Sequence, residues 1–129
     1  MRGRIAVTFG AGRPMEMREY DVRPPHDGEV LVRLAWASIC GSDLHIWRGE
    51  IAGLTGLPGV GGHEMSGVVA ALGRERRLDS TGKSLKEGDR VTFAYFIPCG
   101  ACAACLTGAT GCPNRYRRRK DLTVDDDPH

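Results

Sequence analysis

Four of the five cysteines in this sequence lie within one short segment. They are separated by two, two and six residues, and they are Cys99, Cys102, Cys105 and Cys112. Spacers of two residues allow neighbouring thiolates to reach a single ion, and a closed set of four thiolates is typical of structural zinc. The sequence therefore predicts a structural zinc loop over residues 97–114.

Other interpretations of this segment stay open. Cysteines are often small buried hydrophobic residues that bind nothing. An iron–sulfur cluster is the closer competitor, because Pro113 follows Cys112 as a proline follows the last cysteine of the bacterial ferredoxin pattern. That pattern has three residues before its last cysteine, however, and this segment has six. The odd number of cysteines, without a secretion signal, argues against a disulfide framework.

The fifth cysteine, Cys40, belongs to a second group of residues that could do chemistry. One thiolate, one imidazole and one carboxylate are ligands of catalytic zinc sites, which keep a position open for water or substrate. Cys40, His63 and Glu64 would supply them. Successive residues of a strand point to opposite faces, so His63 and Glu64 can bind one ion only if the backbone bends there. Gly61 and Gly62, directly before them, would allow such a bend.

Three polar neighbours could assist at this site. Ser42 and His45 could relay a proton from a hydroxyl at the zinc to solvent. Asp43 could accept a hydrogen bond from His63 and so fix the tautomer of its ring. On these residues alone, a core cysteine and ordinary hydrogen-bonded histidines are the competing interpretation.

A strand over residues 29–39 is the clearest element, and it leads directly into Cys40. Strict alternation would place four apolar side chains on one of its faces: Val30, Val32, Leu34 and Trp36. After it, residues 41–47 are expected to form a short helical turn with Ser42 as its cap.

Further short strands are expected over residues 4–9, 15–22, 63–72 and 88–96. Glycine, proline and charged residues predict loops over 23–28, 48–62 and 74–87. Short strands with long loops predict a mostly-β fold, a partial β-barrel.

Composition and charge fit one soluble domain. The chain has 129 residues, of which 41% are hydrophobic and 26% charged, and its net charge is +2. We expect no membrane span, because the sequence holds no apolar run of about 18 residues, and the cytoplasm as the compartment. The basic run within residues 115–120 is followed by Asp121 and Asp125–Asp127, which favours a solvated loop over a nucleic-acid interface.

Four motifs together resemble the zinc-dependent medium-chain alcohol dehydrogenases, and they occur in the order of that family. They are Cys40–His45; Gly62–Glu64 with Gly67–Val69; Gly88–Val91; and Pro98-Cys99-Gly100 through Cys112-Pro113-Asn114. The resemblance covers roughly residues 29–114. It implies the GroES-like β-barrel catalytic domain of the family over residues 1–129, with the structural zinc loop 97–114 inside it.

The resemblance also implies roles for individual residues. Cys40 and His63 would bind the catalytic zinc, and Glu64 matches a glutamate that lies beside that zinc and can bind it transiently. Ser42 and His45 match the proton relay of the family, and Asp43 matches the partner of the zinc-bound histidine. The four loop cysteines would bind the structural zinc.

The implied reaction is hydride transfer between a small-molecule alcohol or carbonyl and NAD or NADP, in a homo-oligomeric parent enzyme. Zinc would act as a Lewis acid and nicotinamide would take the hydride. The walls of the substrate pocket could include Trp47, Leu54, Leu57 and Phe93.

Three departures from the family pattern matter. The last spacer of the cysteine segment has six residues where the family usually has seven. Neither a third protein ligand to the catalytic zinc nor a Gly-x-Gly-x-x-Gly turn of a Rossmann domain occurs in the 129 residues. We therefore expect a truncated chain that is inactive by itself. A stand-alone, non-catalytic zinc module and an iron–sulfur electron carrier are the rival functions.

Overall fold

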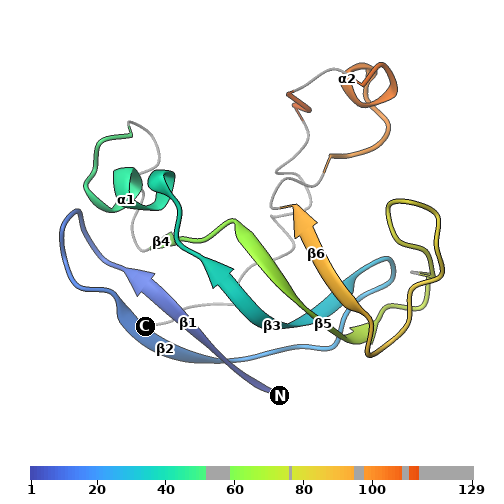
Figure 1. Cartoon of the computed structure of the whole chain (residues 1–129), viewed down its shortest axis with the longest axis horizontal. Helices are drawn as coiled ribbons and strands as arrows, with labels where there is room; N and C mark the ends of the chain where they lie inside the picture. Colours follow the sequence, from blue (N-terminus) through green and yellow to red (C-terminus); the bar gives the residue numbers. More distant parts are fainter. Residues whose placement is uncertain (52–58, 76, 95–97, 109–110, 114–129) are drawn as a thin grey trace. The chain divides into compact units, whose positions relative to one another are not determined.

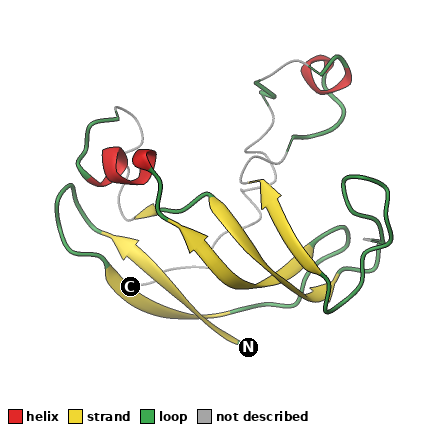
Figure 2. Ribbon diagram, viewed as in Figure 1, coloured by secondary structure: helices red, strands yellow, loops and turns green. Residues whose placement is uncertain are grey.

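A computed structural model describes residues 1–51, 59–75, 77–94, 98–108 and 111–113 of the chain. In this part, six strands and two short helices follow one another, and strands dominate (Figures 1 and 2). The chain divides into two compact units, Met1–Phe93 and Ala94–His129. The mostly-β prediction is confirmed, with open sheets and long loops.

The first sheet has the strand order β2-β1-β4. Its strands are β1 (Arg2–Thr8), β2 (Glu16–Asp21) and β4 (Gly59–Val60). β1 pairs antiparallel with both neighbours, from Arg2 opposite Asp21 to Val7 opposite Glu16 on one side. The two predicted strands agree with β1 and β2 to within two residues at each end. β4 was not predicted, because a strand of two residues is too short to show any periodicity.

The second sheet has the strand order β3-β5-β6 and carries the first candidate site. Its strands are β3 (Val30–Ser38), β5 (Glu64–Leu72) and β6 (Arg90–Ala94). β3 and β5 run antiparallel from Val30 opposite Leu72 to Ser38 opposite Glu64. Strands were predicted in all three places. Residues 95–96, where the third was expected to end, lie outside the described part.

The pairing of β3 with β5 is irregular at two points, between Leu31 and Val32 and between Leu34 and Trp36. Each irregularity interrupts the two-residue period of a strand. The prediction of strict alternation along 29–39 was therefore wrong in detail, because the period does not run unbroken from Leu34 to Trp36. The side chain of Trp36 is 77% exposed.

Helix α1 (Gly41–Trp47) follows β3 after two residues, as predicted. Its N-cap is Cys40, however, and not Ser42. Cys40 keeps the extended backbone of the strand, with φ −108° and ψ 176°, and its N–H donates to the Asp43 carboxylate at 2.9 Å. Asp43 lies at the third helical position, where an acidic side chain can satisfy the N-cap N–H. The helix therefore begins two residues earlier than it would with Ser42 as its N-cap.

The loops around the second sheet are tied down by local contacts. The turn before β6 exchanges two backbone hydrogen bonds with Val69 of β5, from Gly88 N and to Asp89 O, both 2.9 Å long. Before β3, Glu29 accepts hydrogen bonds from both terminal nitrogens of Arg23. The Arg23 guanidinium is the largest influence on Glu29 and lowers the pKa of its carboxyl to about 2, against the opposing effect of burial.

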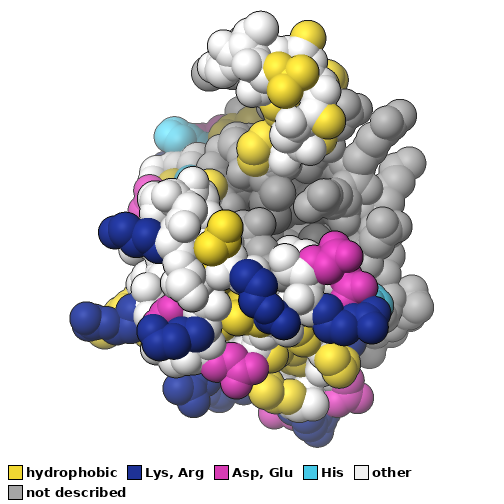
Figure 3. Space-filling model, turned by 90° about the vertical axis from the view of Figure 1, so that its right-hand side faces the viewer, with side chains coloured by type: hydrophobic (Ala, Val, Ile, Leu, Met, Phe, Trp, Pro, Cys, Tyr) yellow, Lys and Arg dark blue, Asp and Glu magenta, His cyan; other side chains and the backbone are white. Residues whose placement is uncertain are grey.

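The hydrophobic core of the described residues is small. Val7 of β1 and Val69 of β5 are its fully buried large side chains, with exposures of 1% and 2%. The face in Figure 3 carries acidic and basic side chains next to each other rather than a patch of one sign. Neither helix of the described part is long and apolar enough to cross a bilayer.

Candidate metal centres

The first candidate centre is built where β3 ends and β5 begins. The antiparallel register puts Ser38 opposite Glu64, so the residues just outside this pair, Cys40 and His63, come close together. Gly62 has the left-handed φ of 93°, and His63 precedes the first strand residue. The alternation rule therefore does not apply to the pair His63 and Glu64, and the positive φ at Gly62 uses the backbone freedom that was expected of Gly61-Gly62.

The distances in this group suit a metal ion. The Cys40 Sγ lies 3.2 Å from the His63 Nε2. Two such ligands on a tetrahedral zinc ion would be about 3.6 Å apart, from Zn–S and Zn–N bonds of about 2.3 and 2.05 Å. One ligand atom each from Cys40, His63 and Glu64 lie within 4.8 Å of one another, and Glu64 is the exposed member. The thiol and imidazole pair therefore fits zinc with a small adjustment.

Asp43 holds both ligand segments through one buried carboxylate, which is only 9% exposed. Its oxygens accept the N–H groups of Cys40 at 2.9 Å and of Gly62 at 3.0 Å. The His63 Nδ1 lies 3.5 Å from the Oδ1 of Asp43. Burial alone would raise the pKa of Asp43, but these two N–H donors and the other contacts outweigh it, so the pKa lies below its ordinary value. The Asp43 carboxylate is therefore an anionic hydrogen-bond acceptor on the Nδ1 side of the His63 ring.

Of the two residues expected to relay protons, Ser42 lies beside the ligands. Its Oγ is 2.9 Å from the Cys40 Sγ and 3.3 Å from the His63 Nε2. His45 lies nearly one helical turn further along α1, where its Nδ1 contacts the carboxylate of Glu50. The structure thus groups Ser42, Asp43 and Glu64 around Cys40 and His63, and places His45 at the other end of the helix.

A hollow of about 400 Å³ adjoins His63 and Glu64. Phe93, expected in the pocket wall, lines it, and so does Trp36, which sequence reasoning missed. Trp47, also expected there, is turned to a different partner, since its indole N–H donates to the Arg13 carbonyl at 2.7 Å. Leu54 and Leu57 lie outside the described residues. Trp36 could have been predicted from its position, because it lies four residues before Cys40 on the strand that leads to it.

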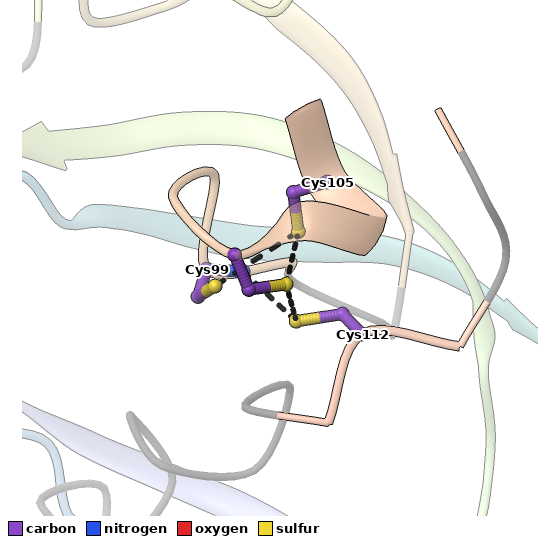
Figure 4. A group of neighbouring side chains, drawn as sticks. Cys99, Cys105 and Cys112 are labelled. Carbon is purple, nitrogen blue, oxygen red and sulfur yellow. Dashed lines mark hydrogen bonds between the residues drawn. The ribbon is translucent and has the colours of Figure 1, made fainter. Parts of the chain in front are cut away.

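The second candidate centre consists of the four loop cysteines, which converge as Figure 4 shows for three labelled side chains. Three Sγ–Sγ distances are 3.5, 3.8 and 3.9 Å, for the pairs Cys102–Cys105, Cys102–Cys112 and Cys99–Cys105. Four sulfur ligands at about 2.3 Å around a tetrahedral zinc ion would be about 3.8 Å apart. The cluster therefore has the size of a tetrathiolate zinc site.

Short-range structure produces this convergence. Helix α2 (Ala103–Leu106) is one turn long, and Cys102 and Cys105 lie at its N-cap and third position. This turn was not predicted, because four residues are too few for a helical period to be visible. Gly100 and Gly111 adopt left-handed φ values of 74° and 92°, which let the chain turn beside Cys99 and Cys112.

None of the five cysteines forms a disulfide, and the sulfur distances exceed by far the roughly 2.05 Å of a disulfide bond. At Cys105, the Gly100 backbone N–H lowers the pKa, whereas burial and the three neighbouring thiols raise it, and the result is about 11. The Cys105 thiol therefore resists ionisation unless a cation compensates its charge. The chemistry of this donor set fits a metal cation held by the four sulfurs.

Comparison with known proteins agrees with this geometry. Residues 26–118 match the family model described as the alcohol dehydrogenase GroES-like domain. A curated relative, S-(hydroxymethyl)glutathione dehydrogenase of Photobacterium damsela subsp. piscicida, is 40% identical over 111 residues. These residues cover 85% of this chain but only 28% of the relative.

Solved structures match a similar share of this chain. A thermostable alcohol dehydrogenase of Pyrobaculum aerophilum, with cobalt and zinc bound, has 28% identity and a TM-score of 0.68, over 85% of this chain and 32% of that one. An alcohol dehydrogenase of Escherichia coli CFT073 in complex with NADH has 32% identity and a TM-score of 0.66, over 88% and 29%. The chain thus spans about a third or less of these relatives.

Proposed function

Because this chain belongs to the alcohol dehydrogenase GroES-like domain family, we propose that it supplies the zinc-binding catalytic part of an NAD- or NADP-dependent alcohol dehydrogenase. The reaction would oxidise a small-molecule alcohol to a carbonyl, or reduce the carbonyl. The observation that carries the proposal is the distance of 3.2 Å between the Cys40 Sγ and the His63 Nε2. His63 also lines a hollow and contacts the buried carboxylate of Asp43.

The residues of this site have distinct proposed tasks. Cys40 and His63 would hold the catalytic zinc, with Glu64 as an exposed carboxylate within reach. When bound, zinc would favour ionisation of the substrate hydroxyl as a Lewis acid. Asp43 would keep the hydrogen of His63 on Nδ1, so that Nε2 faces the metal. Ser42 and His45 would pass the substrate proton towards solvent.

The loop cysteines would hold a second, structural zinc. The sulfur spacing and the absence of disulfides support this role, and a closed set of four thiolates leaves no position for substrate. The hydride acceptor would be NAD or NADP, as in the similar E. coli structure that was solved with NADH. We assign no nucleotide contact to residues of this chain. The whole enzyme would be a homo-oligomer.

Metal content per chain tests the proposal on protein purified without added metal. We expect about two zinc ions per chain, falling to about one in Cys40→Ser and to about one in Cys102→Ser. About one zinc ion, retained in Cys40→Ser and lost in Cys102→Ser, would contradict a catalytic zinc and favour a non-catalytic zinc module. Iron in place of zinc would contradict both.

A further inference from the structure

Helix α1 ends in a Schellman motif that fixes the residue after its terminal glycine. Gly49 follows the C-cap Arg48 with a left-handed φ of 73°. Its N–H donates to the Ile46 carbonyl at 3.0 Å, and the N–H of Glu50 donates to the His45 carbonyl at 2.9 Å. These are the two hydrogen bonds that define the motif. They place Glu50 next to His45 by backbone geometry alone.

The two side chains at these positions form a polar contact. A Schellman motif usually brings two hydrophobic side chains together at this point. Here the His45 Nδ1 contacts the Glu50 Oε2, and the side chains are 55% and 47% exposed. An ionised carboxylate can only accept hydrogen bonds, so the Nδ1 of His45 must carry the hydrogen. In neutral His45 the lone pair is then on Nε2.

Trp47, in the last turn of α1, makes two hydrogen bonds to the loop that follows β1. The carbonyl of Trp47 accepts the N–H of Gly12 at 2.8 Å, and the indole N–H of Trp47 donates to the carbonyl of Arg13 at 2.7 Å. These bonds anchor the last turn of α1 to the loop that follows β1. These bonds and the two of the Schellman motif hold the backbone on both sides of the His45–Glu50 contact.

We propose that Glu50 is a positioning residue that holds His45 in the Nδ1–H tautomer and leaves Nε2 as its proton-accepting nitrogen. This inference rests on the proposed function, in which His45 carries the substrate proton towards solvent. A proton taken up at Nε2 converts His45 to imidazolium, whose charge the adjacent carboxylate balances. A neutral histidine with its hydrogen on Nε2 could not accept a proton at that atom.

Two substitutions at position 50 test whether the hydrogen-bond acceptor, and not merely a side chain of similar size, sets the tautomer of His45. Glu50→Leu puts an apolar side chain at this position, as is usual for the motif, and removes the acceptor. Glu50→Gln keeps an acceptor oxygen in a side chain of nearly the same size. The readout is the tautomer of neutral His45, from long-range proton–nitrogen correlations of the full chain loaded with zinc, at a pH about two units above the ordinary histidine pKa. The spectrum of His45→Asn identifies the His45 signals.

We expect the Nδ1–H tautomer in the wild type and in Glu50→Gln, and a shift towards Nε2–H in Glu50→Leu. An Nε2–H tautomer in the wild type, or an unchanged tautomer in Glu50→Leu, would overturn the proposal. The tautomer does not depend on turnover, so a protein that fails the zinc test can still show it.

Kinetics of the complete enzyme provide the second readout. Glu50→Leu is expected to lower kcat about tenfold with little change in KM, because proton transfer is impaired and substrate binding is not. Glu50→Gln should stay within about threefold of the wild type in kcat. An equal loss in both variants would mean that the carboxylate acts through its charge alone, and would overturn the tautomer role.

Discussion

Asp43 joins two segments of the chain through a single carboxylate. It accepts the N–H groups of Cys40 and Gly62, which lie 22 residues apart in the sequence, and it faces the imidazole of His63. Both N–H groups are partly buried, so each would lose a hydrogen bond that water replaces poorly if the carboxylate were removed. Asp43 therefore contributes to folding as well as to the proposed zinc site.

This dual contact gives a prediction at the scale of the residue. Asp43→Ala is expected to lower the free energy of unfolding by about 2 kcal/mol, because two N–H donors lose their acceptor. Asp43→Asn should cost about 1 kcal/mol, since its amide oxygen still accepts while its NH₂ group faces a donor. Urea denaturation of the metal-free chain measures both. The control is Glu87→Ala, an exposed acidic residue; equal midpoints for Asp43→Ala and this control would contradict the prediction.

The pair of strands β3 and β5 is the element that brings the first candidate site together. Gly67 of β5 lies close to the backbone of β3. A β-carbon at Gly67 would meet the Arg33 carbonyl oxygen at 2.3 Å and a methyl group of Val32 at 2.8 Å. Distances below 3 Å to backbone atoms cannot be relieved by a side-chain rotation. The close approach of the strands, and with it the position of Cys40 against His63, therefore requires glycine at this position.

The strand pair gives the prediction at the element scale. Gly67→Ala is expected to lower the free energy of unfolding by about 2–3 kcal/mol, because the strands must separate to admit a methyl group. The matched control is Gly41→Ala, since a β-carbon there meets nothing within 4 Å. Thermal and urea unfolding compare the two. If both variants unfolded at the same midpoint, the tight approach at Gly67 would not limit stability.

The whole chain consists of two compact units, and each carries one candidate metal site. Met1–Phe93 contains both sheets and the Cys40–His63 group, whereas Ala94–His129 contains the four-cysteine loop. Among its described residues 98–108 and 111–113, the regular structure is the one-turn helix α2. We therefore expect the order of the described cysteine loop to depend on a bound zinc ion, as in other small zinc sites.

The prediction at the scale of the molecule is that zinc loss acts unequally on the two units. Cys102→Ser, or chelation of zinc, should raise amide hydrogen exchange across residues 98–108 by at least about tenfold and leave β3 and β5 protected. Cys40→Ser should leave both regions protected, because its site is held by Asp43 and the strand register. Mass spectrometry after exchange distinguishes them; identical patterns in the two variants would contradict a division into a structural and an open site.

Features that depend on residues close together in the chain could be predicted from the sequence. Cys99, Cys102 and Cys105 are three residues apart, so one turn of helix and a left-handed glycine bring them together, and the composition of the segment sufficed to predict the cluster. The helical turn after β3 could be predicted for the same reason. Its N-cap could not, because a serine at 42 is a good cap and only the structure shows that Asp43 accepts the N–H of Cys40.

By itself, then, the sequence determined the ligand types, the short spacing of the four loop cysteines and the succession of strands. The tertiary structure decided which distant residues meet. Cys40 and His63 are 23 residues apart, and their approach depends on the register of β3 against β5, including two irregularities that no periodicity shows. The contact of Glu50 with His45 is local by comparison, since it follows from the left-handed Gly49 at the end of α1. Strand register depends on many backbone contacts at once, so no single residue type reveals it.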